Sequence, residues 1–321
     1  MKICFSCGGT GGHIYPALAI AEKFTDCFFI GSRRLEKTLA PQAGHRFYEI
    51  PASSKDPRAV MAGFYQALKI LAREKPDLVI ATGGYVTVPV ILAAKLLGKK
   101  VYLQEQNILP GRVNRYLSHL AAKVFIAFAG AAKYFPRNKA VLTGNPVRKD
   151  ILNVGFSPNN TKILVFGGSL SAKSLNIATN ALKTSEALLN TIVHLDGTNY
   201  QHNMADLYSN AKLCVCRAGA TTLSELAAVG LPSILIPYPQ AADNHQEFNA
   251  RYFTERGAAV LLLDKDLTAD SLAAAIARID NPETLTRMSN AAKTLHFKNA
   301  AEKIKDFIVG QYTRRFEKLD G

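Results

Sequence analysis

No apolar run in the sequence is long enough to cross a membrane. The longest run, from Val86 to Leu97, falls short of the ~20 residues that a spanning helix needs, and it contains Lys95. A signal-peptide pattern is missing as well, because the strand-like segment KICFSC follows Met1 without a charged start, a long apolar segment or a cleavage site. We therefore expect a cytosolic protein.

Cysteine is too scarce and too irregularly spaced for a disulfide framework. The chain has 5 cysteines, an odd number, which favours a reducing compartment. Cys4 and Cys7 have CxxC spacing, but a zinc site would need a second pair, and Cys214 and Cys216 form only a CxC. Both pairs lie in apolar, strand-like runs, so we expect small buried side chains rather than metal ligands.

Acidic residues are scarce in the first half of the chain. Residues 1–150 hold 22 lysines and arginines against 9 aspartates and glutamates, whereas residues 151–321 hold 17 against 16. The formal net charge of +14 therefore comes almost entirely from the first half. This asymmetry indicates that the first half faces something anionic: nucleic acid, a phosphorylated substrate or a lipid surface.

Short apolar runs alternate with longer helical patterns along the whole chain. With 321 residues, of which 48% are hydrophobic, the chain is long enough for two domains. Strands that alternate with helices predict parallel sheets covered on both faces, and two series of about five strands predict two Rossmann-like domains. Glycine, asparagine and proline cluster in residues 143–162, so we expect the domains to be 1–150 and 151–321.

The segment CGGTGGHIYP, after the first predicted strand, is a glycine-rich loop that opens a helix. The dinucleotide fingerprint fails because Ile14 stands where the third glycine belongs, and the second strand ends in GSRRLE without the ribose-binding acid. A P-loop fails because His13 and Ile14 replace its lysine and hydroxyl residue. What remains is a glycine turn whose amides can approach an anion at a helix start, with His13 at its mouth as a candidate for proton transfer or binding.

Two more glycine turns follow predicted strands, in ATGGYVTVP (residues 81–89) and FGGSLSAKS (residues 166–174). Further polar clusters are QEQNILPGRVN, TGNPVR, RAGATTLSEL and DNHQEFNA. The segment VLLLDKD imitates a strand followed by the DxD motif that holds a divalent ion. We prefer a helix start capped by Thr268 or Asp266, and we expect neither a metal nor another cofactor.

Together these motifs resemble the MurG family of cell-wall glucosaminyltransferases, and the matching segments run in family order from residue 8 to residue 250. The resemblance implies an α/β GT-B fold, in which two Rossmann-like domains with parallel sheets face a cleft. The first domain would bind the acceptor, the second would bind the donor, and the last helix would return to the first domain. The implied enzyme is an inverting hexosyltransferase at the cytoplasmic face of the cell membrane. It moves N-acetylglucosamine from UDP-N-acetylglucosamine to undecaprenyl-pyrophosphoryl-muramyl-pentapeptide (lipid I), which gives lipid II for peptidoglycan synthesis.

The resemblance also implies site residues. Glu225 looks like the carboxylate that accepts hydrogen bonds from the ribose hydroxyls, and Ser169 is similar to the family's phosphate-contacting serine. His245 and Gln246 lie where the family contacts N-acetylglucosamine. The resemblance implies further positions that bind UDP-N-acetylglucosamine. They are Asn107 and Arg148 across the cleft, Thr10, Gly11 and Gly12 on the first glycine loop, and Ala220, Thr221, Thr222, Leu223 and Ser224 at the start of the helix that holds Glu225.

Residues 195–205 depart from the family pattern, because few residues separate the strand TIVHLD from KLCVC. The family has another helix and strand there, followed by an apolar residue whose backbone meets uracil. Gln201 falls near that position. We therefore expect a shortened second domain, and we do not assume the family's uracil contact.

In the implied reaction a sugar 4-hydroxyl attacks the anomeric carbon of the donor, with inversion and loss of UDP. We expect His13 to take the hydroxyl proton or to orient the acceptor, with Glu105 as a second candidate base. Ser169 and Arg148 are candidates for stabilising the leaving pyrophosphate.

The basic first half fits an acceptor whose pyrophosphate lies on an anionic membrane surface. In the predicted helix 61–75, five apolar side chains share one stripe, and such a stripe faces the core more often than a membrane. These side chains are Met61, Phe64, Tyr65, Leu68 and Leu71.

Three other functions fit parts of the sequence. A GT-B-like sugar-nucleotide epimerase would use the same donor without a lipid acceptor. A nucleotide- or RNA-binding module would explain the pI near 9.5, but its aromatic platforms or basic stripe are not grouped here, so we expect no nucleic-acid partner. A Rossmann dehydrogenase fails on the missing third glycine and ribose acid.

Overall fold

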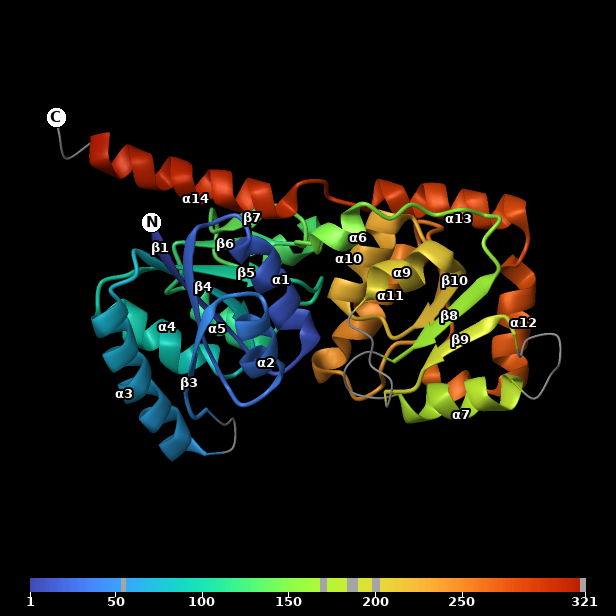
Figure 1. Cartoon of the computed structure of the whole chain (residues 1–321), viewed down its shortest axis with the longest axis horizontal. Coiled ribbons are helices and arrows are strands. Elements are labelled where there is room, and N and C mark those ends of the chain that lie inside the picture. Colours follow the sequence, from blue (N-terminus) through green and yellow to red (C-terminus); the bar gives the residue numbers. More distant parts are fainter. Residues whose placement is uncertain (53–55, 168–171, 184–189, 198–202, 318–321) are drawn as a thin grey trace. The chain divides into compact units, whose positions relative to one another are not determined.

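The computed structural model describes residues 1–52, 56–167, 172–183, 190–197 and 203–317, with side chains described as far as residue 312. The chain divides into two compact units (Figure 1). The first unit holds Met1–Pro146 and Phe297–Gly321, and the second holds Val147–His296. Each unit is built around one parallel β-sheet.

The sheet of the first unit has seven described strands in the order β3-β2-β1-β4-β5-β6-β7. The chain enters the middle of the sheet at β1, builds outward to β3, and then returns to pair β4 with the other side of β1. This reversal is a topological switch point, where ligands of open α/β sheets bind beyond the carboxyl ends of the strands. The strands are β1 (Lys2–Cys7), β2 (Asp26–Gly31), β3 (Arg46–Glu49), β4 (Leu78–Gly83), β5 (Lys100–Glu105), β6 (Lys123–Ile126) and β7 (Ala140–Leu142).

The two edge strands, β3 and β7, are the ones that the sequence pattern misses. The central strands are almost entirely buried and read as continuous apolar runs, as expected for a parallel sheet covered on both faces. The edge strands have sequences RFYE and AVL, are short, and keep several side chains partly exposed. Their apolar runs are therefore too short to be distinguished from loop.

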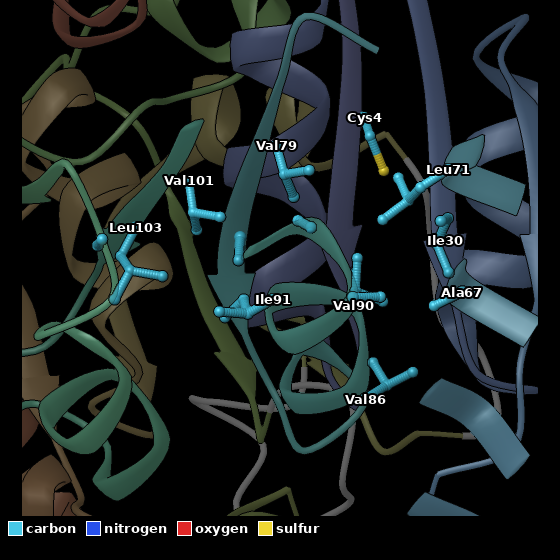
Figure 2. Packing of buried hydrophobic residues seen from close by; sticks show 14 of the residues in the cluster. Cys4, Ile30, Ala67, Leu71, Val79, Val86, Val90, Ile91, Val101 and Leu103 are labelled. Atoms are coloured by element: carbon cyan, nitrogen blue, oxygen red, sulfur yellow. The ribbon is translucent and has the colours of Figure 1, made fainter. Parts of the chain in front are cut away.

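Helices cover both faces of the first sheet, and each face has its own apolar core. On one face, Ala67 and Leu71 of α3 and Val90 of α4 pack against strand residues such as Cys4 and Val79 (Figure 2). The other face packs against α1 and α14. The helices are α1 (Gly11–Ala21), α2 (Leu35–Gln42), α3 (Pro57–Glu74), α4 (Thr87–Leu96), α5 (Arg112–Leu117), the 3₁₀ helix η1 (Ala129–Tyr134) and α14 (Ala300–Glu317).

The last helix, α14, belongs to the first unit although it lies at the far end of the sequence. Its Ile304 and Ile308 are buried in the core that also holds Ile14 and Ile20 of α1. The hydroxyl of Tyr312 donates a hydrogen bond to Asp77 Oδ1 at 3.0 Å. The buried isoleucines and this hydrogen bond thus hold α14 on the first unit.

Helix α3 corrects the expectation for its apolar stripe. Phe64, Leu68 and Leu71 pack on the core, but Met61 and Tyr65 are 53% and 57% exposed. The apolar stripe is wider than the face of α3 that packs on the core. Met61 and Tyr65, which are four residues apart and lie at the border of the stripe, are therefore exposed. The helix also begins earlier than predicted, because Asp56 accepts a hydrogen bond from the backbone N–H of Arg58 and Pro57 occupies the first turn.

The second unit has five described strands in the order β12-β11-β10-β8-β9, all parallel. The strands are β8 (Lys162–Phe166), β9 (Ile192–Leu195), β10 (Ala211–Cys216), β11 (Ser233–Leu235) and β12 (Ala259–Leu261). The helices are α6 (Lys149–Leu152), α7 (Lys173–Leu182), α9 (Met204–Asn210), α10 (Ala220–Val229), η2 (Ala242–Asn244), α11 (His245–Thr254), η3 (Asp264–Asp266), α12 (Ala269–Ile279) and α13 (Pro282–Thr294).

The cysteines lie in the cores, as the apolar surroundings of both pairs predict. Cys4, Cys7, Cys27, Cys214 and Cys216 are all buried and carry free thiols. Burial raises the pKa of the Cys4 and Cys7 thiols well above the ordinary value, so these groups are poor nucleophiles. Among the helices of the described ranges, none combines the length and the apolar character that crossing a membrane requires.

Candidate functional site

In the first unit, the glycine loop of residues 8–10 connects β1 to α1 and packs against the glycine turn that follows β4. A Cβ atom on Gly84 would collide with the carbonyl oxygen of Gly8, so the two turns meet backbone to backbone. Gly9 has a φ of +99°, a conformation that favours glycine. Thr10 precedes α1 in an extended conformation, and its side chain makes no capping hydrogen bond. Gly11 is buried and Gly12 half-buried in the first turn.

Glu36 is a residue of this loop region that the sequence analysis missed. Its carboxylate is fully buried and accepts hydrogen bonds from Gly9 N at 3.4 Å, Ser32 N at 2.8 Å and Ser32 Oγ at 2.5 Å. It lies in the first turn of α2, where the helix dipole favours a negative charge. No ribose-binding acid stands directly at the end of β2. Glu36, the last residue of GSRRLE, is instead buried and binds the backbone of the glycine loop at Gly9.

His13 lies in the first turn of α1, half-buried, with Nδ1 3.2 Å from Gln106 Oε1. Its ring packs on Gly83, where a Cβ atom would lie 2.7 Å from His13 Cε1. The hydroxyl of Thr82 donates to the carbonyl oxygen of His13 at 2.8 Å. The carboxyl ends of β4 and β5 thus hold this histidine in one place and orientation.

Glu105, the second candidate base, is buried and accepts hydrogen bonds from the loop that follows β5 and from α5. It accepts hydrogen bonds from Asn107 N at 2.9 Å, Asn107 Nδ2 at 3.1 Å, Gly111 N at 3.1 Å and Asn114 Nδ2 at 2.9 Å. Burial raises the pKa of Glu105, and these hydrogen bonds oppose that effect. The contacts favour a role in shaping the loop that carries Asn107 over a role in proton transfer.

In the second unit, Glu225 is buried in α10 and binds two side chains. Its Oε1 accepts from Arg148 Nε at 3.2 Å and Nη2 at 3.1 Å, and its Oε2 accepts from the hydroxyl of Tyr208 at 2.9 Å. Burial raises the pKa of Glu225, whereas Arg148 and the Tyr208 hydrogen bond lower it. The structure thus brings Arg148 and Glu225 together within one unit, and it adds Tyr208, which the sequence analysis did not single out.

The first turn of α10 carries the other donor-binding candidates of this helix. Ala220, Thr221 and Leu223 are buried, while Thr222 and Ser224 are half-buried. Ser224 Oγ donates to the carbonyl oxygen of Ala220 at 2.9 Å. The positive dipole end of such a helix N-terminus favours an anion.

Two more candidates belong to α11 and the turn before it. Gln246 Oε1 accepts a hydrogen bond from Tyr238 N at 2.9 Å, and His245 Nδ1 lies 2.7 Å from the carbonyl oxygen of Ala242. Gln246 therefore holds the loop that leaves β11. Ser169 and Gln201 lie outside the described residues, as do residues 198–202 of the departure from the family pattern.

The DKD segment forms an ion pair instead of a cluster of carboxylates. Asp264 accepts hydrogen bonds from Arg217 Nη1 at 2.5 Å and Ser174 Oγ at 2.7 Å. Thr268 caps α12 in a reciprocal box with Ser271, which confirms one of the two predicted caps. In the part of the chain that the structure describes, no three His, Cys, Asp or Glu side chains are grouped to hold a metal ion.

Known protein families match both parts of the chain. Residues 3–126 match the glycosyltransferase family 28 N-terminal domain, and residues 178–304 match the glycosyltransferase family 28 C-terminal domain. The UDP-N-acetylglucosamine–N-acetylmuramyl-(pentapeptide) pyrophosphoryl-undecaprenol N-acetylglucosamine transferase of Desulforudis audaxviator is 40% identical over 375 residues, covering 98% of this chain and 100% of that protein. The protein of the same name from Thermoanaerobacter sp. is 38% identical over 360 residues, covering 96% and 99%.

A solved structure agrees with these relatives. The crystal structure of Acinetobacter baumannii MurG aligns with a TM-score of 0.78 and 29% sequence identity, covering 97% of this chain and 100% of that one. The two parallel sheets with their helices are therefore those of a GT-B glycosyltransferase, which confirms the predicted fold class.

Proposed function

The chain belongs to the MurG family of glycosyltransferases, and from this premise we propose that it moves N-acetylglucosamine from UDP-N-acetylglucosamine to undecaprenyl-pyrophosphoryl-muramyl-pentapeptide. The observation that carries the proposal is the carboxylate of Glu225, which Arg148 and Tyr208 hold at a helix that begins beyond the carboxyl end of β10. In the proposed assignment of roles, the first unit binds the acceptor, and the second unit, which holds Arg148 and Glu225, binds the donor.

Glu225 is suited to bind the ribose of the donor. An ionised carboxylate has about four acceptor positions, and Arg148 and Tyr208 occupy only part of this capacity. The remaining position, on Oε2, can accept a hydrogen bond from a ribose hydroxyl. The N-terminal turn of α10 then lies next to the ribose and offers backbone N–H groups to the anionic part of the same donor.

His13 is suited to assist the acceptor. In the transfer, the 4-hydroxyl oxygen of the muramyl sugar forms a bond to the anomeric carbon while the bond from that carbon to the UDP oxygen breaks with inversion. The hydroxyl proton passes to a base, and the electron pair leaves with UDP. His13 lies in the first turn of α1, directly after the glycine loop at the switch point of the first sheet, and an imidazole accepts a proton near neutral pH.

A transfer assay tests this function directly. We expect the purified full chain to move labelled N-acetylglucosamine from UDP-N-acetylglucosamine to a lipid I analogue and to release UDP in equal amount. UDP and free sugar without a lipid-linked disaccharide would replace the proposal with the epimerase alternative. If neither product forms while UDP binds, the donor assignment stands and the acceptor assignment is wrong.

We also propose that the first unit binds an anionic membrane surface through α3 and α4. These neighbouring helices expose Met61, Tyr65, Leu92 and Leu96, although their buried faces pack on the core. Four exposed basic residues lie on the same two helices: Arg58, Lys69, Arg73 and Lys95. Apolar side chains flanked by lysine and arginine suit the interface of a membrane that contains anionic lipids, where the acceptor resides.

Vesicle binding tests the membrane surface. Replacing both Met61 and Tyr65 by serine removes the most exposed apolar side chains of α3, so we expect binding to vesicles that contain anionic lipid to weaken about 10-fold. Cosedimentation measures the change, and Tyr116→Ser is the matched control because Tyr116 is 77% exposed on α5 of the same unit. Equal loss in both variants, or no loss in either, would place the surface elsewhere.

A further inference from the structure

The side-chain amide of Gln106 has only one chemically acceptable orientation. Gln106 is buried just beyond the end of β5, and its Nε2 lies 2.7 Å from the carbonyl oxygen of Thr82 and 3.2 Å from the carbonyl oxygen of Gln104. Backbone carbonyl oxygens only accept hydrogen bonds, so the NH₂ group must face them. An amide flipped by 180° would place two oxygens together at both contacts, which excludes it.

The orientation of Gln106 determines which nitrogen of His13 carries the proton. With the NH₂ group on the carbonyl oxygens, Gln106 Oε1 faces His13 Nδ1 at 3.2 Å. An amide oxygen cannot donate, so Nδ1 must be the donor of this hydrogen bond. In a neutral imidazole the lone pair then lies on Nε2.

We propose that Gln106 is a positioning residue, which holds His13 in the tautomer protonated at Nδ1 so that Nε2 is the nitrogen that accepts the acceptor's hydroxyl proton. This inference rests on the proposed transfer reaction, and it identifies the reacting atom of His13. The partner is a neutral amide. Gln106 therefore selects the tautomer without adding a negative charge beside the ring.

A buried polar network supports Gln106 in this role. Gln106 Nε2 also contacts Gln104 Oε1, and Gln104 Nε2 donates to Asn145 Oδ1 at 3.0 Å. Thr82, Gln104 and Asn145 are all buried. Fully satisfied buried networks hold a single arrangement, because any rotation would leave a buried polar group without a partner.

The ring itself is also fixed in position. Gly83 has a φ of +120°, and a Cβ atom there would lie 2.8 Å from His13 Nδ1, so the glycine allows the imidazole to lie against the turn. Thr82 Oγ1 holds the backbone of His13 at 2.8 Å. Thr82 and Gln106 lie 69 and 93 residues after His13 in the sequence. The sheet topology brings the three residues together.

Nitrogen NMR of the histidine side chains tests the tautomer without any substrate. In the full chain labelled at histidine nitrogen, above the pH at which His13 is protonated, we expect a pyrrole-like signal from Nδ1 and a pyridine-like signal from Nε2. The spectrum of His13→Asn identifies the His13 signals by their absence. In Gln106→Met, which keeps the side-chain length but removes the acceptor, we expect the population to shift toward protonation at Nε2.

Gln104→Met is the matched control, because it removes another buried amide of the same network without touching His13. We expect it to leave the tautomer unchanged. A purely structural role would make the two variants alike. Protonation at Nε2 in the wild-type chain, or an unchanged tautomer in Gln106→Met, would overturn the proposal.

Kinetics separate this proposal from the function on which it rests. We expect Gln106→Met to lower kcat roughly 10-fold, the order of magnitude of one buried hydrogen bond, while the Kd for UDP stays the same. If the tautomer shifts as expected and kcat does not change, Gln106 sets the tautomer but Nε2 is not the reacting atom. If the wild-type chain transfers no sugar, the NMR result still stands and the function fails instead.

Discussion

Replacing His13 by alanine lowers kcat for transfer to a lipid I analogue by about 10²–10⁴-fold, the usual contribution of a well-placed general base. The Kd for UDP stays within roughly 2-fold of the wild-type value, because Glu225, the carboxylate that we propose binds the ribose, belongs to the other unit. The loss falls on kcat since proton transfer takes place only in the transition state. Steady-state transfer kinetics and calorimetry with UDP measure the two quantities separately.

His119→Ala is the matched control for His13→Ala. His119 is an exposed histidine of the same unit, and its removal should leave kcat unchanged. Thermal unfolding of both variants shows whether the first unit keeps its stability. A His13→Ala enzyme that transfers at the wild-type rate would remove His13 from the mechanism, and Glu105→Gln would then be the next variant to measure.

Replacing Glu225 by glutamine raises the Kd for UDP and for UDP-N-acetylglucosamine by about 10- to 100-fold, since one charge-assisted hydrogen bond to the ribose contributes roughly 1.5–3 kcal/mol. Glutamine keeps the size of the side chain but replaces one of its two acceptor oxygens by an NH₂ group. Arg148 also loses its ion pair at a position with 15% side-chain exposure. Calorimetry gives the affinity, and thermal unfolding reports any cost to stability.

The pH dependence of UDP binding distinguishes a charge effect from a shape effect. Burial raises the pKa of Glu225 above its ordinary value of 4.5, and the ribose contact that we propose needs the ionised carboxylate. As the pH falls through this raised pKa the carboxylate takes up a proton, so wild-type affinity is present above it and declines below it. The glutamine variant should lack this decline. The same decline in both proteins would assign it to another group.

Tyr208→Phe provides a graded comparison for Glu225. It removes one hydrogen bond to Oε2 while the carboxylate keeps its charge and its contact with Arg148. We expect a rise in the Kd for UDP of about 10-fold or less, the effect of one hydrogen bond. An effect as large as that of Glu225→Gln would mean that Tyr208 holds the whole carboxylate in place.

Much of this protein can be predicted from local patterns. Glycines in residues 8–12, 83–84 and 167–168 follow apolar strands, and this spacing indicates glycine turns at the ends of parallel strands. The buried central strands were found because residues covered on both faces form continuous apolar runs. The edge strands β3 and β7 were not, because a strand with one free edge needs few apolar residues.

The candidate site was predicted unevenly. His13 and Glu225 could be found because each lies within a glycine-rich or helix-start motif of recognisable sequence. Glu36 was passed over because it follows β2 by several residues, where a charged residue at a helix start usually faces water. Its inward direction depends on the packing of Gly8 and Gly31, whose missing side chains leave the space that Glu36 fills.

The sequence by itself determined the α/β fold class, because strand and helix periodicity are local properties of a few consecutive residues. It indicated the family through the resemblance of its motifs between residues 8 and 250. Only the tertiary structure decided how the candidate groups are paired. His13 meets Gln106 across 93 residues, and Arg148 meets Glu225 across 77 residues. The first pair forms because parallel strands bring their carboxyl ends to one edge of a sheet, and the second forms because α6 packs against α10.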